Sequence, residues 1–119
     1  MKKVYYLSTC DTCKRIIKEL GIGSEFDYQD IKTDRITEEQ LEEMKGLAGS
    51  YEALFSRVAR KYKALGLKDV KLEEEDYRDH ILREYTFLKR PVFMIGNDIF
   101  IGNSKKTIEK AKAALGIDQ

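Results

Sequence analysis

A Cys-x-x-Cys motif lies where a predicted strand meets a predicted helix. Lys3–Leu7 is a short apolar run of β-branched and aromatic residues, which is typical of a buried strand. From Asp11 onward the apolar residues fall at i, i+3, i+4 and i+7, the spacing of an amphipathic helix, and Gly21 ends the pattern. The motif therefore straddles a strand-to-helix junction, with Cys10 before the helix and Cys13 one turn inside it.

The two ends of the chain predict the parts of one mixed sheet. Residues 25–31 alternate as a second strand, so the opening is a βαβ unit whose first two strands are parallel. Near the other end, two apolar runs, 92–95 and 98–101, flank Gly96-Asn97 and predict a hairpin with a tight turn. Residues 105–115 predict a closing helix with Ile108, Ala111 and Leu115 facing inward.

The middle of the chain predicts helices and no strand. Thr37 to Gln40 is a capping box that opens a helix through Lys45, which Gly46 and Gly49 are expected to end. Segments 51–65 and 73–85 have helical periodicity. We expect four tyrosines in these segments to pack in the core, and His80 to lie on the polar, surface side of its helix; the tyrosines are Tyr51, Tyr62, Tyr77 and Tyr85.

The order of the elements predicts an α/β protein with a thioredoxin-like fold: β-α-β, a helical insert, then β-β-α around a mixed sheet. We expect residues 1–119 to form a single domain, with the insert at about 35–88, because 119 residues are too few for two ordinary domains. No cysteine framework or structural metal is needed to stabilise a core, since 42% of the residues are apolar.

Charge and hydropathy exclude several classes of protein. Lys and Arg number 22 against 21 Asp and Glu, and a net charge of +1 does not favour a general binder of nucleic acid or of membrane surfaces. No stretch approaches the roughly 18 apolar residues of a membrane-spanning helix. The N-terminus has no secretory apolar region, so we expect a cytoplasmic protein. In the cytoplasm a close cysteine pair indicates redox chemistry or metal binding.

The positions of the two cysteines predict different roles. Cys10 precedes the helix, where unpaired N–H groups and the helix dipole favour a thiolate, so it is the candidate nucleophile. Cys13 shares the apolar face, and its burial should raise the pKa of a thiol that attacks second. The positive charges of Lys14 and Arg15 favour the Cys10 thiolate, and the negative charge of Asp11 opposes it. The sequence therefore leaves open whether the pKa of Cys10 is raised or lowered.

Two other interpretations of the pair exist. A zinc site needs four ligands, and the sequence offers only His80 as a further nitrogen or sulfur ligand, so we expect no metal. The thiols could also be inert core side chains. Redox chemistry is the interpretation that the motif favours.

Residues 6–15 and 88–92, with the helical middle between them, resemble the ArsC/Spx family. That family contains glutaredoxin-coupled arsenate reductases and Spx transcription regulators, and its fold is a thioredoxin-like sheet with an inserted helical subdomain. By resemblance, Cys10 is the reactive cysteine and Arg90 the arginine before the family proline. Pro91 matches the proline that is cis and faces the thiol, and Arg57 matches the arginine of the insert. Arg60, one turn later, is a further candidate, since guanidinium groups suit an oxyanion or a thiolate.

The resemblance implies a thiol-dependent reductase in which Cys10 attacks arsenate or a disulfide and Cys13 resolves the adduct. No bound cofactor is expected; glutathione with glutaredoxin, or thioredoxin, would supply electrons to a monomeric protein. Dedicated arsenate reductases typically carry one cysteine in this loop and a further arginine near the last strand. Residues 98–106 hold no arginine, only Lys105 and Lys106. With Cys13 present, the protein could close an internal Cys10–Cys13 disulfide instead, and the two departures together weaken arsenate as the substrate.

Two alternatives stay open. The first is an Spx-like redox regulator that binds the RNA polymerase α subunit. The spacing from Gly49 to Arg57 resembles the spacing of a glycine and the insert arginine in that branch of the family. The basic tail of such regulators is missing from the last residues, 115–119. Binding to the polymerase α C-terminal domain, with and without reductant, would separate the regulator from the enzyme. The second is an inactive thioredoxin-fold protein, whose Cys10 pKa would lie near the usual value of about 8.5.

Overall fold

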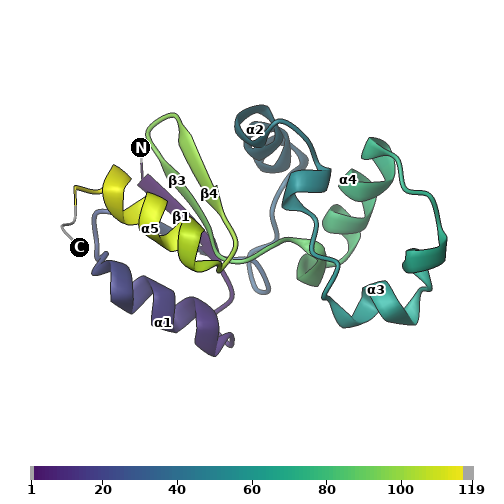
Figure 1. Ribbon diagram of the computed structural model, residues 1–119, viewed down its shortest axis with the longest axis horizontal. Helices are drawn as coiled ribbons and strands as arrows, with labels where there is room; N and C mark the ends of the chain where they lie inside the picture. Colours follow the sequence, from purple (N-terminus) through teal and green to yellow (C-terminus); the bar gives the residue numbers. More distant parts are fainter. Residues whose placement is uncertain (1, 117–119) are drawn as a thin grey trace. The chain divides into compact units, whose positions relative to one another are not determined.

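The computed structural model describes residues 2–116, and Figure 1 traces their course. The chain divides into two compact units. The sheet unit comprises residues 2–34 and 90–116, and the helical unit comprises Arg35–Lys89. The last three residues of the tail, 117–119, lie outside the described residues. Among those described, no helix combines the length and the apolar character that crossing a membrane requires.

The sheet unit contains a four-stranded mixed sheet. Its strands lie in the order β2-β1-β3-β4. Strand β1 pairs with β2 in parallel, as the βαβ prediction requires, and with β3 antiparallel, while β3 and β4 form the predicted hairpin. The strands are β1 Lys2–Tyr6, β2 Asp27–Asp30, β3 Val92–Ile95 and β4 Asp98–Ile101. The α/β, thioredoxin-like fold is confirmed.

Helices α1 (Asp11–Leu20) and α5 (Lys105–Ala114) cover one face of this sheet (Figure 1). Their apolar residues join residues of β1 and β3 in one buried cluster: Val4, Ile16, Leu20, Phe26, Phe93, Ile95, Ile108 and Ala111. Gly21 ends α1 in the left-handed conformation (φ 64°), which glycine adopts without steric strain. The core thus fixes α1, and with it the cysteine motif, against the sheet.

The helical unit is built from short helices. The chain forms α2 Glu38–Ala48, η1 Glu52–Leu54, α3 Arg60–Ala64, η2 Leu67–Asp69, α4 Glu74–Arg83 and η3 Tyr85–Phe87. The Thr37–Gln40 capping box that opens α2 is present, with both of its reciprocal hydrogen bonds. Tyr77 is buried against Phe55, as predicted. The other three tyrosines are only half-buried, and one of them, Tyr62, has its ring against Phe55; the three are Tyr51, Tyr62 and Tyr85.

The prediction of a continuous helical segment over residues 51–65 is wrong. Phe55 is extended (φ −85°, ψ 128°) and forms an isolated antiparallel bridge with Leu88. Ser56 N–H donates to the Phe87 carbonyl at 2.7 Å, so the main chain bonds to a distant segment instead of continuing a helix. In consequence Val58 is 94% exposed, although its spacing placed it in the core.

Three further details of the helical unit differ from the prediction. Gly46 does not end α2, which continues to Ala48 and ends at Gly49 (φ 97°), because an interior glycine costs only about 1 kcal/mol. The fourth helix ends at Arg83, where the backbone becomes extended at Glu84. His80 is not a surface side chain; its ring is half-buried, with its centroid 5.3 Å from that of Phe87.

Candidate active site

Cys10 is the N-cap residue of α1, in an extended conformation (φ −95°, ψ 112°). Its N–H donates to the Leu7 carbonyl at 3.0 Å, and its own carbonyl accepts from Lys14 N–H at 3.1 Å. These bonds join the end of β1 to the first turn of the helix and hold the half-buried Cys10 at the junction. Both cysteines are free thiols.

The surroundings of Cys10 favour its thiolate. Partial burial acts to raise the pKa of the Cys10 thiol. Hydrogen bonds from the backbone and thiol of Cys13 and from the backbone of Thr12, together with the charge of Arg90, outweigh this and hold the pKa of Cys10 below its ordinary value. The pKa of Cys10, whose direction of shift the sequence left open, is therefore lowered, which favours the thiolate.

Cys13 has the opposite environment. Its side chain is fully buried. Burial raises the pKa of Cys13 to about 11, and the neighbouring Cys10 adds to the effect through a hydrogen bond and its charge. The motif thus holds one thiol that ionises readily and one that stays protonated while the first is an anion.

Arg90 and Pro91 lie immediately before β3 in the same unit. The Arg90–Pro91 peptide bond is cis, as the family resemblance implies. The positive charge of Arg90 lowers the pKa of both cysteines, although it is a smaller influence than burial and hydrogen bonding. The sheet unit therefore brings together four of the predicted site residues: Cys10, Cys13, Arg90 and Pro91.

The other two predicted site residues, Arg57 and Arg60, belong to the helical unit. One guanidinium nitrogen of Arg57, Nη2, donates to Glu52 at 2.7 Å and to the Tyr77 hydroxyl at 2.9 Å. The hydrogen bond to Glu52 raises the pKa of Arg57. Arg60 begins α3 and is exposed. Arg57 is therefore held in place by a carboxylate, whereas Arg60 projects into solvent.

The sequence prediction missed Asp30, at the end of β2. The Ser8 hydroxyl donates to one carboxylate oxygen of Asp30 at 2.5 Å, and Lys32 N–H donates to the other at 3.2 Å. These bonds, that of Ser8 above all, lower the pKa of Asp30. Asp30 thus anchors the loop that leads to Cys10. Its place was foreseeable, because the carboxyl ends of adjacent parallel strands meet at one edge of a sheet.

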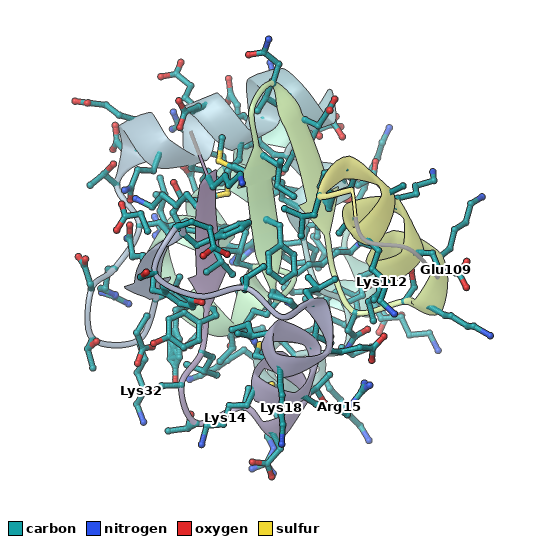
Figure 2. All side chains as sticks on the ribbon, turned by 90° about the vertical axis from the view of Figure 1, so that its left-hand side faces the viewer. Lys14, Arg15, Lys18, Lys32, Glu109 and Lys112 are labelled. Atoms are coloured by element: carbon teal, nitrogen blue, oxygen red, sulfur yellow. The ribbon has the colours of Figure 1, made fainter. Side chains whose placement is uncertain are left out.

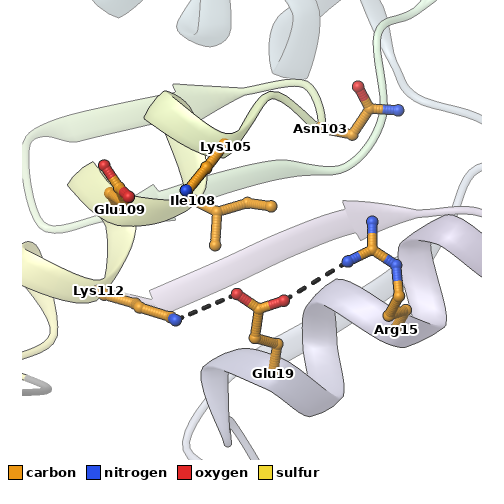
Figure 3. A pocket seen from close by; sticks show the side chains of 7 residues that line it. All are labelled: Arg15, Glu19, Asn103, Lys105, Ile108, Glu109 and Lys112. Atoms are coloured by element: carbon orange, nitrogen blue, oxygen red, sulfur yellow. Dashed lines mark hydrogen bonds and ion pairs between the residues drawn. The ribbon is translucent and has the colours of Figure 1, made fainter. Parts of the chain in front are cut away.

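The helix that carries Cys13 has a basic outer side. Lys14, Arg15 and Lys18 project outward from α1 (Figure 2). A shallow pocket of about 470 Å³ separates this side from α5, and Glu19 within it pairs with Arg15 at 3.5 Å and with Lys112 at 3.1 Å (Figure 3). The lining residues are Arg15, Glu19, Asn103, Lys105, Ile108, Glu109 and Lys112. The pocket contains no thiol, and two of its cations are already paired. Within residues 2–116 no three His, Cys, Asp or Glu side chains are grouped to hold a metal.

The sequence pattern of the ArsC family matches residues 5–111. The chain belongs to the ArsC family. The match spans both units and includes the cysteine motif, so family membership does not rest on the motif alone. It supports a thiol oxidoreductase of the ArsC type. No match was found among curated protein sequences.

Solved structures confirm the ArsC-type fold over nearly the whole chain. The YffB protein (PA3664) superposes with a TM-score of 0.79 at 23% identity, covering 97% of this chain and 99% of that one. An arsenate reductase from Vibrio cholerae superposes with a TM-score of 0.74 at 16% identity, covering 98% and 97%. SACOL0876 from Staphylococcus aureus COL gives 0.71 at 23%, covering 92% and 97%. At these identities the similarity establishes the fold.

Proposed function

We propose that this ArsC-family protein is a dithiol reductase that acts on disulfides, with Cys10 as nucleophile and Cys13 as resolving thiol. The observation that carries the proposal is the placement of the two thiols. Cys10 lies at the N-cap of α1, where its pKa is lowered, and Cys13 is fully buried one turn later, where its pKa is raised to about 11. A thiol pair of this kind offers one nucleophile at neutral pH and keeps the second thiol in reserve.

The reaction proceeds in two exchange steps. The Cys10 thiolate attacks one sulfur of the substrate disulfide, a Cys10–substrate bond forms, and the substrate S–S bond breaks to release one thiolate, which takes a proton from solvent. Cys13, once deprotonated, attacks Cys10 Sγ, and the second substrate thiol leaves. Two electrons pass from the dithiol to the substrate, and a Cys10–Cys13 disulfide remains. A glutathione- or thioredoxin-type donor returns the two electrons.

The first step prepares the second. Two of the influences that raise the pKa of Cys13 are the hydrogen bond to Cys10 and the charge of Cys10. Both disappear when Cys10 is bonded to the substrate, whereas the charge of Arg90 continues to favour the Cys13 thiolate. The pKa of Cys13 therefore falls in the mixed disulfide, at the stage where its thiolate is needed.

Arg57 bears on the choice of substrate. Its guanidinium already bonds the carboxylate of Glu52, and this negative charge disfavours an arsenate anion beside it. The missing arginine in residues 98–106 points the same way. Under the proposal Arg90 favours the thiolate, and the roles of Arg57 and Arg60 in holding substrate are secondary. A neutral or weakly charged disulfide is the substrate that these features favour.

Steady-state turnover tests the proposal. The purified protein is assayed with hydroxyethyl disulfide and with arsenate, each with the glutathione–glutaredoxin and the thioredoxin systems as electron donors. We expect turnover with the disulfide, loss of it in Cys10→Ser, and a trapped mixed disulfide in Cys13→Ser, seen by mass spectrometry. Full activity of Cys10→Ser would overturn the mechanism, and faster turnover of arsenate would overturn the substrate.

The pH dependence of alkylation gives an independent check on the thiols. The rate of Cys10 alkylation should have its midpoint below the usual cysteine pKa of about 8.5. Cys13→Ala removes the hydrogen bond from the Cys13 thiol, so the midpoint should rise. A midpoint that lies near 8.5 in the wild type, unchanged by Cys13→Ala, would instead indicate the inactive protein.

A further inference from the structure

One segment of the helical unit holds an excess of positive charge. The basic segment, residues 57–71, has six basic side chains and one acidic side chain, Asp69, which leaves 16 basic and 20 acidic residues in the rest of the chain. The basic segment therefore has a charge of +5, and the excess of acidic residues in the rest of the chain reduces the net charge to +1. The six basic residues are Arg57, Arg60, Lys61, Lys63, Lys68 and Lys71.

Most of this charge is not neutralised within the molecule. Arg57 pairs with Glu52, and Lys71 approaches Glu73 at 3.9 Å. Within residues 2–116 the other four basic side chains of the segment make no ion pair. The acidic residues of this unit are concentrated elsewhere, on α2 and in the first turn of α4. The charges of the segment are thus available to a partner.

The same segment exposes large apolar side chains. Val58 is 94% exposed, Leu65 55% and Val70 51%. The other large apolar residues exposed in the described chain are Tyr28 and Leu47, so three of the five lie in this short segment. Single exposed apolar residues are ordinary, but their concentration among unpaired cations is typical of an interaction surface.

The combination selects among possible ligands. Single-stranded nucleic acid would need aromatic side chains for stacking, and the one aromatic residue of the segment, Tyr62, is half-buried against Phe55. A membrane surface is bound by a helix with a continuous apolar face, whereas α3 has five residues. A protein surface offers both acidic groups for the cations and apolar groups for Val58 and Leu65.

We propose that residues 57–71 form a docking surface for an acidic protein segment that carries apolar side chains. A second copy of this chain would have to supply α2, with its four glutamates and the exposed Leu47. Among the described residues, Leu47 is the one large exposed apolar side chain that α2 would bring against Val58, Leu65 and Val70, and Figure 1 shows α2 well apart from α3 within the helical unit. A different, acidic protein is therefore the partner that this surface fits.

Binding of designed peptides tests the proposal on the full chain. One fluorescent peptide combines glutamate with leucine, and a second of equal length and charge has serine in place of leucine. The first should bind with a Kd of about micromolar order, and the second about tenfold more weakly. Lys61→Glu with Lys63→Glu should weaken binding of the first by about tenfold or more, and salt should weaken it too.

Three variants serve as controls. Lys106→Glu with Lys110→Glu makes the same change of charge on α5 and should leave binding unchanged. Val58→Ser with Leu65→Ser should abolish the difference between the two peptides. Cys10→Ser should bind as the wild type does, so this test is independent of the thiol chemistry.

Four results would overturn the docking surface. The first is equal binding of both peptides by the wild type. The second and third are tighter binding of a DNA oligonucleotide, or of phosphatidylglycerol vesicles, than of the leucine peptide. The fourth is self-association of the wild type that is lost in the variant Lys61→Glu with Lys63→Glu.

Discussion

The two units hold their structure together in different ways. In the sheet unit, β1 is hydrogen-bonded to β2 on one side and to β3 on the other, and both helices pack on the same sheet. In the helical unit, the one isolated bridge of the described residues joins Phe55 to Leu88. The Phe55 ring contacts four further rings, with centroids 4.9–6.3 Å away: Tyr62, Tyr77, His80 and Phe87. Stability is therefore distributed over main-chain ladders in one unit and concentrated around one side chain in the other.

This difference suits the division of roles that we propose. The thiols need fixed geometry, and the ends of paired strands supply it, because each strand restrains its neighbour. A docking surface needs exposed side chains more than a rigid scaffold, and the segment after Phe55 leaves Val58, Leu65 and Val70 largely in solvent.

Phe55→Ala should be the most damaging core substitution. Both Phe55 and Phe93 are buried, and replacing either by alanine should cost about 3–5 kcal/mol of unfolding free energy. Among the described residues Phe93 has one ring partner, Phe26, at 6.3 Å, whereas Phe55 has four, and each ring pair adds about 0.5–1.5 kcal/mol. Urea unfolding should therefore show the larger loss for Phe55→Ala.

A control for this experiment is Val58→Ala, which should change the unfolding free energy by less than about 0.5 kcal/mol because Val58 is 94% exposed. Equal losses for the two phenylalanines would remove the contrast between the units. A large loss for Val58→Ala would restore the helical prediction for residues 51–65.

Asp30→Ala tests the anchor of the cysteine loop. The substitution leaves the Ser8 hydroxyl and Lys32 N–H without their acceptor and should cost about 1–3 kcal/mol at neutral pH. The pKa of Asp30 is lowered in the folded state, so its contribution is complete above the unfolded pKa of about 3.9 and is lost as the pH falls through the folded value. Urea unfolding measures this: the difference in unfolding free energy between wild type and Asp30→Ala should be smaller in acid than at neutral pH.

Asp27→Ala is the matched control in the same strand, because the exposed Asp27 carboxylate makes only a long ion pair with Lys3, at 3.8 Å. It should cost less than about 1 kcal/mol at neutral pH. A cost equal to that of Asp30→Ala would assign the effect to the strand and not to the loop anchor.

Local signals explain how much of the structure could be predicted. Gly21 after an amphipathic run, the Thr37 capping box and the Gly96-Asn97 turn each act within a few residues, and each appears where it was predicted. The positions of Cys10 and Cys13 relative to the helix follow from the same local reasoning, and the burial of Cys13 is confirmed.

Three of the misses involve contacts between segments far apart in the sequence. Phe55 leaves the helical pattern because its partner Leu88 lies 33 positions later, and no periodicity within 51–65 records that partner. The role of Asp30 was missed because its partner Ser8 is 22 residues away, although the predicted parallel strands would have placed both residues at one edge of the sheet. His80 lies beside the ring of Phe55, from a segment 25 positions earlier, and beside that of Phe87. In each case a contact with a distant segment, which the local sequence pattern does not record, determined the conformation, the burial or the role of the residue.

The two glycines of α2 provide the smallest effect and the most direct test of a corrected boundary. Gly46 lies inside the helix and a Cβ there would meet no atom within 4 Å, so Gly46→Ala should stabilise the protein by about 0.5–1 kcal/mol. Gly49 has φ 97°, and Gly49→Ala should cost about 1–2 kcal/mol although the space around it is equally open. Thermal unfolding of both variants measures the difference. If Gly46 instead ended the helix in a left-handed conformation, as Gly49 does, Gly46→Ala would also be destabilising, and the two effects would have the same sign.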